Sequence, residues 1–196
     1  MIAGAVVERA DSGDAGWVAD LIAYAFHDLP PAVWLVPEPG ERRRALAGQF
    51  RILVEHALLH GHVDVTADRA GVAVWFRRLS PAFPPPEHYV PRLDVVCGRW
   101  TDRFLVLDDI FDHHHPTGPH HHLAFLAVQP ERQRQGIGST LLGHHHTRLD
   151  ASGTPAYLEA PNPANRDYYL RHGYQVREPF RLPDGPPFWP MWRSPR

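Results

Sequence analysis

Lysine is absent from this sequence of 196 residues, because all 20 basic residues are arginine. A lysine Schiff base and the phosphate-binding lysine of a P-loop are therefore excluded, and with them pyridoxal phosphate enzymes and P-loop nucleotidases. The arginines nearly balance 22 acidic residues and leave a formal net charge of −2. This balance gives no electrostatic reason to expect nucleic acid as a partner.

Cysteine and long apolar runs are scarce as well. Cys97 is the only cysteine and cannot form a disulfide within the chain, so the sequence requires no oxidising compartment and predicts a cytoplasmic protein. No segment approaches the roughly 18 consecutive apolar residues of a membrane helix, and the apolar run within residues 1–9 is too short for a signal peptide. We expect no membrane partner.

Strand-like and helix-like segments alternate along the chain. Since 43% of the residues are hydrophobic and no repeat or linker interrupts the alternation, we expect one mixed α/β domain over residues 1–196. Apolar runs predict strands at Val6–Ala10, Val63–Thr66, Val72–Phe76, Leu123–Val128, Ala156–Ala160, Val176–Arg181 and Phe188–Arg193.

Apolar residues at helical spacing predict the helices, and capping residues mark their ends. Asp14 is expected to cap the first helix, and the proline-rich segment 28–40 is expected to form a packed loop. The stripe from Leu93 to Phe111 is the strongest amphipathic signal and predicts a helix, with Cys97 beside it as a small core residue. Further helices are expected around Leu46–Ala57, after Gly136, and from Pro163 to Gly173.

One glycine motif carries a chemical signal. The segment Gln133-Arg134-Gln135-Gly136-Ile137-Gly138 lies between a predicted strand and a predicted helix. Its two glycines permit a tight turn and a close approach to a ligand, and the free N–H groups at the start of the helix favour a pyrophosphate. Leu141 stands where the dinucleotide-binding fingerprint has its third glycine, so that fingerprint is excluded.

The wider arrangement resembles the GNAT acyltransferase superfamily. That family has a Gln/Arg-x-x-Gly-x-Gly/Ala signature for acetyl-CoA, then a downstream Asn and a Tyr-x-x-x-Gly-Phe/Tyr segment. The residues that fall on this pattern are Gln133, Gly136, Gly138, Asn162, Tyr169, Gly173 and Tyr174. Shorter segments are similar to the puromycin N-acetyltransferase-like branch, namely residues 25–30, 73–75 and 183–186 together with Trp189.

The resemblance implies both a fold and a co-substrate. The fold is a central mixed, mostly antiparallel sheet of about six or seven strands flanked by helices, in which two central parallel strands splay apart. The pantetheine arm of acetyl-CoA would lie between these strands, and backbone amides would hold the pyrophosphate. The implied cofactor-binding residues are Leu126, Ala127, Val128, Gln133, Arg134, Gln135, Gly136, Ile137, Gly138, Ser139, Asn162 and Asn165.

The implied reaction is the attack of a neutral amine on a thioester. An alkyl ammonium is only ~0.1% neutral at pH 7, so the site needs a base, and the departing thiolate benefits from an acid. Tyr169 occupies the acid position of the family, and a packed aromatic residue is the alternative reading. Glu159 and His122 are the two candidates for the base, with a slight preference for Glu159, and a structural role remains open for each.

The acceptor is expected to be a small-molecule amine. By the same resemblance it would contact the first two helices, the loop between them and the last strands. The aromatic character of these segments suits an apolar or ring-bearing amine, and Asp28 could attract its ammonium. The candidate residues are Tyr24, Phe26, Asp28, Trp34 and Trp189, with Phe188 beside them.

Nine of the 15 histidines form three triplets, His113–His115, His120–His122 and His144–His146. Adjacent side chains face opposite sides of a strand and diverge by about 100° on a helix, so one triplet cannot supply three ligands to one ion. We therefore expect no metal, and we expect His145 to be a packed neutral imidazole.

The sequence thus predicts an acetyl-CoA-dependent N-acetyltransferase that acts through a ternary complex, without a covalent acetyl-enzyme. A non-catalytic acyl-CoA-binding sensor of the same fold is the alternative, and the presence of Tyr169 favours the enzyme. A histidine-rich metal-binding protein is a third reading. A homodimer is compatible with all three.

Overall fold

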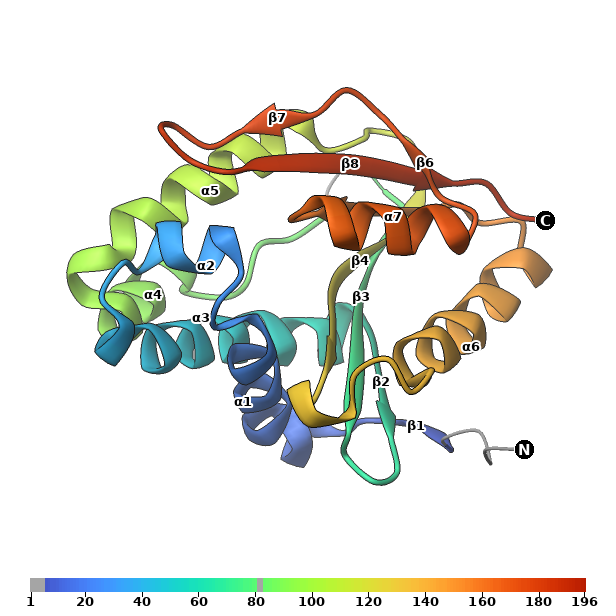
Figure 1. The fold of residues 1–196 in the computed structure, drawn as a ribbon, viewed down its shortest axis with the longest axis horizontal. Coiled ribbons are helices and arrows are strands. Elements are labelled where there is room, and N and C mark those ends of the chain that lie inside the picture. The colour runs from blue at the N-terminus through green and yellow to red at the C-terminus, as the bar shows by residue number, and fades with distance from the viewer. Residues whose placement is uncertain (1–5, 81–82) are drawn as a thin grey trace.

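The strands form one open mixed sheet (Figure 1). The computed structural model describes residues 6–80 and 83–196, so the first five residues of the N-terminal run lie outside it. Within this part the strand order is β1-β2-β3-β4-β5-β8-β6, with β7 paired to β8, and β4–β5 is the parallel pair. The strands are β1 (Val7–Arg9), β2 (Gly61–Thr66), β3 (Gly71–Arg78), β4 (His120–Val128), β5 (Ala156–Ala160), β6 (Gln175–Val176), β7 (Phe180–Arg181) and β8 (Pro187–Arg193).

Seven α-helices of the described residues flank this sheet, with α1 to α5 gathered on one side of the central strands and α6 on the other (Figure 1). None of them combines the length and the hydropathy that crossing a bilayer requires. The mixed α/β fold class predicted from the sequence is confirmed. The helices are α1 (Ala15–Phe26), α2 (Pro30–Leu35), α3 (Pro39–His60), α4 (Tyr89–Cys97), α5 (Thr101–His114), α6 (Ile137–Ala151) and α7 (Pro163–Arg171).

Strand β3 shows why the helices divide between two faces. Val72, Val74 and Phe76 belong to the core that β3 shares with α1 and α3, whereas Ala73 and Trp75 belong to the core shared with α6. All five are buried. Because successive side chains of a strand point to opposite faces, this continuous apolar run serves both layers.

Three local predictions were wrong in detail. Asp14 directly precedes α1, but its side chain makes no capping hydrogen bond. Asp11 instead caps the short 3₁₀ helix Ser12–Asp14, where its carboxylate accepts from Gly13 N at 2.7 Å and Asp14 Oδ2 accepts from Asp11 N at 3.0 Å. The proline-rich loop contains α2, because proline at the first turn of a helix lacks only a donor that is unpaired there. The stripe 93–111 divides into α4 and α5 at Gly98, which has φ +52°.

The last strands also differ from the prediction. Pro179 stands inside the predicted strand Val176–Arg181, and proline cannot donate to a strand ladder. The segment therefore forms two short strands, β6 and β7, which both pair with β8.

Candidate active site

Strands β4 and β5 diverge along their length. Their pairing in the described residues comprises only His121 with Ala156 and His122 with Tyr157. On its other edge, β4 pairs with β3 from His120 to Val128. The β5-facing edge of β4 beyond His122 is thus left open, which is the splayed geometry expected from the sequence.

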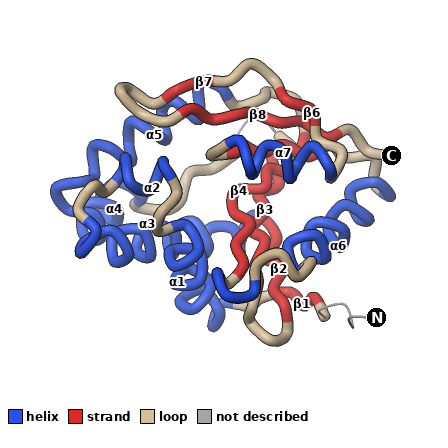
Figure 2. Tube along the Cα trace, in the orientation of Figure 1, coloured by secondary structure: helices blue, strands red, loops and turns tan. Residues whose placement is uncertain are grey.

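The loop 133–136 joins the end of β4 to α6 by way of a short 3₁₀ turn (Figure 2). Gly136 has φ +85°, a conformation that side chains with a Cβ atom rarely adopt, and it starts α6. Within the described residues, the backbone N–H groups of residues 134–139 donate no backbone hydrogen bond, and residues 133–136 are exposed. Helix-start amides of this kind are suited to an anion.

Gly138 allows a close contact between this loop and α7. A Cβ atom there would lie 2.9 Å from the hydroxyl of Tyr168. The same hydroxyl lies 3.4 Å from Ser139 Oγ, which is also 3.1 Å from His172 Nε2. Tyr168 therefore packs against the first turn of α6, and sequence reasoning missed this contact because it joins two separate motifs.

A cavity of about 590 Å³ opens between the splayed strands and helices α1 to α5. Its wall is mostly apolar and aromatic, with carboxylates at Asp108, Asp112 and Glu159. Burial raises the pKa of Asp108 to about 6, and its carboxylate accepts a hydrogen bond from Tyr89 Oη at 2.8 Å. The aromatic part of the wall comes from Phe26, Phe50, Phe76, Phe83, Tyr89, Phe111, Phe125, Tyr169 and Phe188.

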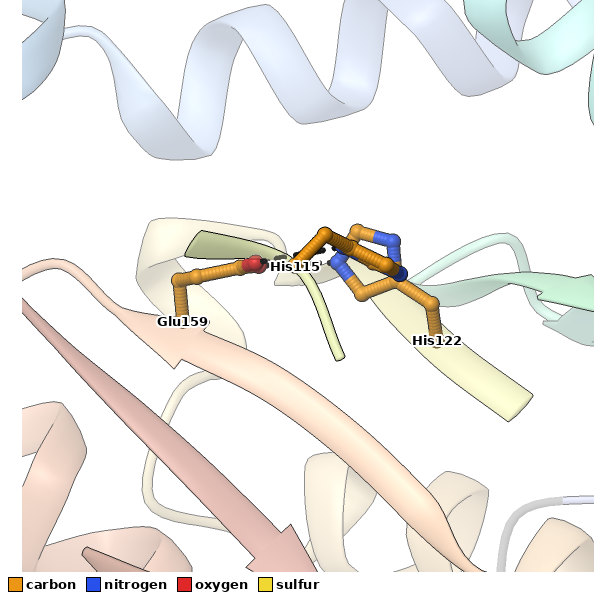
Figure 3. Close-up of side chains that lie close together, drawn as sticks. All are labelled: His115, His122 and Glu159. Atoms are coloured by element: carbon orange, nitrogen blue, oxygen red, sulfur yellow. Dashed lines mark hydrogen bonds and ion pairs between the residues drawn. The ribbon is translucent and has the colours of Figure 1, made fainter. Parts of the chain in front are cut away.

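Glu159 and His122, the two candidates for the base, are hydrogen-bonded partners (Figure 3). Glu159 Oε2 lies 2.8 Å from His122 Nε2, and both side chains are nearly buried in the cavity wall. A third residue, His115, joins them: its Nδ1 lies 3.8 Å from Glu159 Oε1. Sequence reasoning missed His115 because its approach depends on the path of the chain between α5 and β4.

The hydrogen bonds assign the tautomer of His115. The carbonyl of Gly118 can only accept, so His120 Nδ1, at 2.6 Å, carries a proton. Burial lowers the pKa of His120 to about 4, so its Nε2 is bare at neutral pH and accepts from His115 Nε2 at 2.9 Å. Burial also lowers the pKa of His115. His115 is therefore neutral, and its Nδ1 presents a lone pair to Glu159.

The middle member of the same triplet faces the other side of β4. His121 Nδ1 lies 3.0 Å from His145 Nε2, and His145 Nδ1 donates to the buried carboxylate of Asp64 at 2.9 Å. The ring of His145 stacks on Trp75 with 4.1 Å between centroids. The predicted packed role of His145 fits this arrangement.

Tyr169, the candidate acid, lines the cavity from α7 and is 8% exposed. Burial raises the pKa of its phenol, so the hydroxyl keeps its proton at neutral pH. Its neighbour Tyr174 is also buried, but the hydroxyl of Tyr174 lies 3.0 Å from His146 Nε2.

Residues 101–176 match the family model of the acetyltransferase (GNAT) domain. The resemblance to the GNAT superfamily is confirmed. A structure of a histone acetyltransferase HPA2 and related acetyltransferase from Corynebacterium glutamicum has 26% identity and a TM-score of 0.75, over 99% of this chain and 98% of that chain. Two further solved structures share the fold. An agmatine N-acetyltransferase has 15% identity and a TM-score of 0.68, over 98% of this chain and 100% of that chain. A polyamine N-acetyltransferase from Drosophila melanogaster has 14% identity and a TM-score of 0.66, over 96% of this chain and 99% of that chain.

The predicted cofactor-binding residues at the end of β4 and the start of α7 differ in whether they line the cavity. Asn162 Oδ1 accepts from Asn165 N at 2.8 Å, so this side chain caps α7. Asn165 and Leu126 line the cavity, whereas Ala127 and Val128 continue β4 toward the loop.

The predicted acceptor residues divide in the structure. Phe26 lines the cavity, but the other four do not line it in the described residues. The hydroxyl of Tyr24 donates to Glu131, and Trp34 Nε1 donates to the carbonyl of Pro183 at 3.0 Å. The side chain of Asp28 is 88% exposed and lies 2.7 Å from His27, and Trp189 lies under the guanidinium of Arg166. These four side chains have partners outside the cavity, so the structure does not bring them to its wall.

Proposed function

We propose that this protein is an acetyl-CoA-dependent N-acetyltransferase that acetylates a primary amine of a small molecule in a ternary complex. The observation that carries the proposal is the open edge of β4 leading to the backbone amides of residues 134–139, unpaired within the described residues, with a cavity beside it. Acetyl-CoA would supply the acetyl group as a thioester. The backbone of Leu126 and Val128 would hold the pantetheine arm, and the loop amides would hold the pyrophosphate.

Glu159, supported by His122, is proposed as the base. A primary amine arrives mostly as an ammonium, so a proton must leave before attack. The Glu159 carboxylate lies in the cavity wall on β5, beyond the last residue that pairs with β4, and the 2.8 Å contact with His122 orients it. This assignment keeps both sequence candidates, one as the proton acceptor and one as its partner.

Tyr169 is proposed as the acid for the departing thiolate. Its raised pKa keeps the phenol protonated until negative charge develops on the sulfur. Its position on α7, which directly follows β5, places it on the same cavity wall as Glu159.

The acceptor is proposed to be an apolar or ring-bearing amine. The aromatic lining suits a hydrophobic body, and Asp108 and Asp112 offer negative charge to an ammonium. The agmatine and polyamine enzymes among the structural relatives show that this fold accommodates small amines, but a bare polyamine would leave the aromatic wall without a partner.

The test is thiol release from acetyl-CoA with a panel of amines that includes aryl-alkyl amines, aminonucleosides and polyamines. Acetyl-CoA should raise the melting temperature, and Tyr169→Phe should lower kcat at least tenfold while leaving that shift intact. Tyr174→Phe is the matched control, because it removes a buried phenol hydroxyl bonded to His146 and should leave kcat unchanged.

Each outcome separates one alternative. Stabilisation by acetyl-CoA without turnover on any amine would favour the acyl-CoA-binding sensor. No stabilisation would refute both readings, and normal turnover of Tyr169→Phe would refute the acid assignment.

Several finer interpretations stay predictions. They are the puromycin N-acetyltransferase-like branch, a cytoplasmic location, a single domain over residues 1–196, and a homodimer.

A further inference from the structure

Glu159 and His115 face each other beside the cavity without a hydrogen bond between them. Glu159 Oε1 is buried and accepts no well-formed hydrogen bond among the described residues, and it lies 3.8 Å from His115 Nδ1, which is too long for a hydrogen bond. The buried hydroxyl of Tyr157 also interacts with this carboxylate and, within that part of the chain, has no well-formed partner of its own. Both atoms of the 3.8 Å pair are therefore available to a cation.

A metal ion fits this separation. Zn²⁺ binds imidazole nitrogen and carboxylate oxygen at about 2.0–2.1 Å, so two such bonds span up to about 4.1 Å. The ligand atoms of His115, His122 and Glu159 all lie within 4.8 Å of one another. Ligands of a tetrahedral ion are about 3.4 Å apart at these bond lengths, so small side-chain rotations would complete the set.

We propose that His115, His122 and Glu159 form a Zn²⁺ site whose fourth position opens to the cavity. Two imidazoles and one carboxylate are a donor set that suits Zn²⁺, whereas Mg²⁺ and Ca²⁺ prefer oxygen ligands alone. Each ligand comes from a different element, namely the end of α5, β4 and β5 (Figure 3). The site therefore requires the folded chain rather than one histidine triplet.

The surroundings support the ligands. His120 accepts from His115 Nε2 and is itself anchored on the Gly118 carbonyl, an outer hydrogen-bond chain of the kind that orients metal-binding histidines. The positive charge of Arg78, which also lines this wall, opposes the binding of a cation. The carboxylates of Asp112 and Glu159 interact with Arg78 and offset its charge. Side chains of His115, His122 and Glu159 are 9%, 9% and 4% exposed, which limits competition by water.

The site has a functional consequence that rests on the proposed function. A Zn²⁺ ion bound to Glu159 would occupy the carboxylate that is proposed to accept the amine proton, and would separate it from His122. Zn²⁺ should therefore inhibit acetyl transfer, and a chelator should restore it.

The first test measures binding without any activity. Titration calorimetry with Zn²⁺, and the visible absorption of four-coordinate Co²⁺, are recorded for the full chain and for His115→Ala and Glu159→Gln. Both variants should bind Zn²⁺ at least tenfold more weakly and lose the Co²⁺ absorption. His113→Ala is the matched control, since His113 is an exposed member of the same triplet and should bind as the unmodified chain does.

The outcomes are decisive. Equal Zn²⁺ affinity in the unmodified chain and in Glu159→Gln, or no Zn²⁺ binding at all, would overturn the proposal. Mg²⁺ binding of similar strength would overturn the choice of metal. Because Glu159→Gln keeps the shape of the side chain, it decides the question even if His115→Ala does not fold. Binding that is lost in the variants would support the site even where the amine panel gives no turnover.

Discussion

Mild acid should destabilise this protein strongly, because several histidines are buried in neutral form. His120, His121 and His146 are 0%, 8% and 7% exposed. Burial lowers their pKa values to about 4, about 3 and about 3. Their rings are held by Gly118, His145 and Tyr174, contacts that require no charge on the imidazole.

The direction of this change in stability with pH follows from how many protons the folded and unfolded states bind. In the unfolded chain a histidine has a pKa of about 6.5, so between about pH 6.5 and pH 4 the unfolded state binds more protons and stability falls as the pH falls. At pH 5 each buried histidine costs about 2 kcal/mol relative to pH 7.5, hence roughly 4 to 6 kcal/mol for the three. Asp108 acts in the opposite direction, because its pKa of about 6 lies above the unfolded value, and it returns about 1.4 kcal/mol at pH 5.

The net loss of roughly 3 to 5 kcal/mol is a large part of the 5–15 kcal/mol that typically holds a domain folded. Urea unfolding at pH 7.5, 6.5, 5.5 and 5.0 measures it directly. His146→Gln, which keeps a polar partner for Tyr174, should reduce the pH-dependent loss by about 2 kcal/mol, whereas His113→Gln at an exposed position should not. A free energy of unfolding that varies by less than about 1 kcal/mol between pH 7.5 and 5.0 would refute the reasoning.

Three further substitutions test other parts of the structure. Gly136→Ala should cost about 1 kcal/mol of stability because of the φ of +85°, and it should reduce the rise in melting temperature that acetyl-CoA causes. Gly143→Ala is the control: this helical position has open space for a Cβ atom, so the variant should gain about 0.5–1 kcal/mol of stability. Asp150→Ala removes two bonds of 2.8 and 2.7 Å to the buried Arg193 and should cost about 3 kcal/mol in urea unfolding. Asp108→Asn should raise KM for the amine several-fold with kcat nearly unchanged, and exposed Asp109→Asn should change neither.

The glycine loop between β4 and α6 could be predicted because its signal is local. Two glycines follow the strand closely in the sequence. Gly136 adopts a positive φ, and Gly138 leaves room for Tyr168. These two residues are therefore enough to predict the loop. The same holds for Asn162, whose side chain caps the helix it starts.

The lining of the cavity could not be predicted in this way. Each of the helices α1 to α5 contains at least one aromatic residue. Nothing in the neighbouring sequence distinguishes Phe26, which lines the cavity, from Trp34, which donates a hydrogen bond to Pro183. Asp108 and Phe111 were read only as part of a helix because their direction depends on the break at Gly98. The division of that stripe into two helices therefore determines which of its side chains line the cavity.

The metal site that we propose uses residues of different segments, so the argument from spacing within each histidine triplet does not address it. One triplet cannot supply three ligands to an ion, and in β4 its members do separate, with His121 on the face of His145 and His122 on the face of Glu159. That argument considers each triplet alone. The chain return from α5 to β4 brings the last residue of one triplet, His115, to the last residue of the next, His122, and the parallel neighbour β5 adds Glu159. A metal site that takes one ligand from each of several segments cannot be detected from the spacing of residues within one segment. In a histidine-rich sequence, metal sites therefore have to be sought among the segments that become neighbours in the fold.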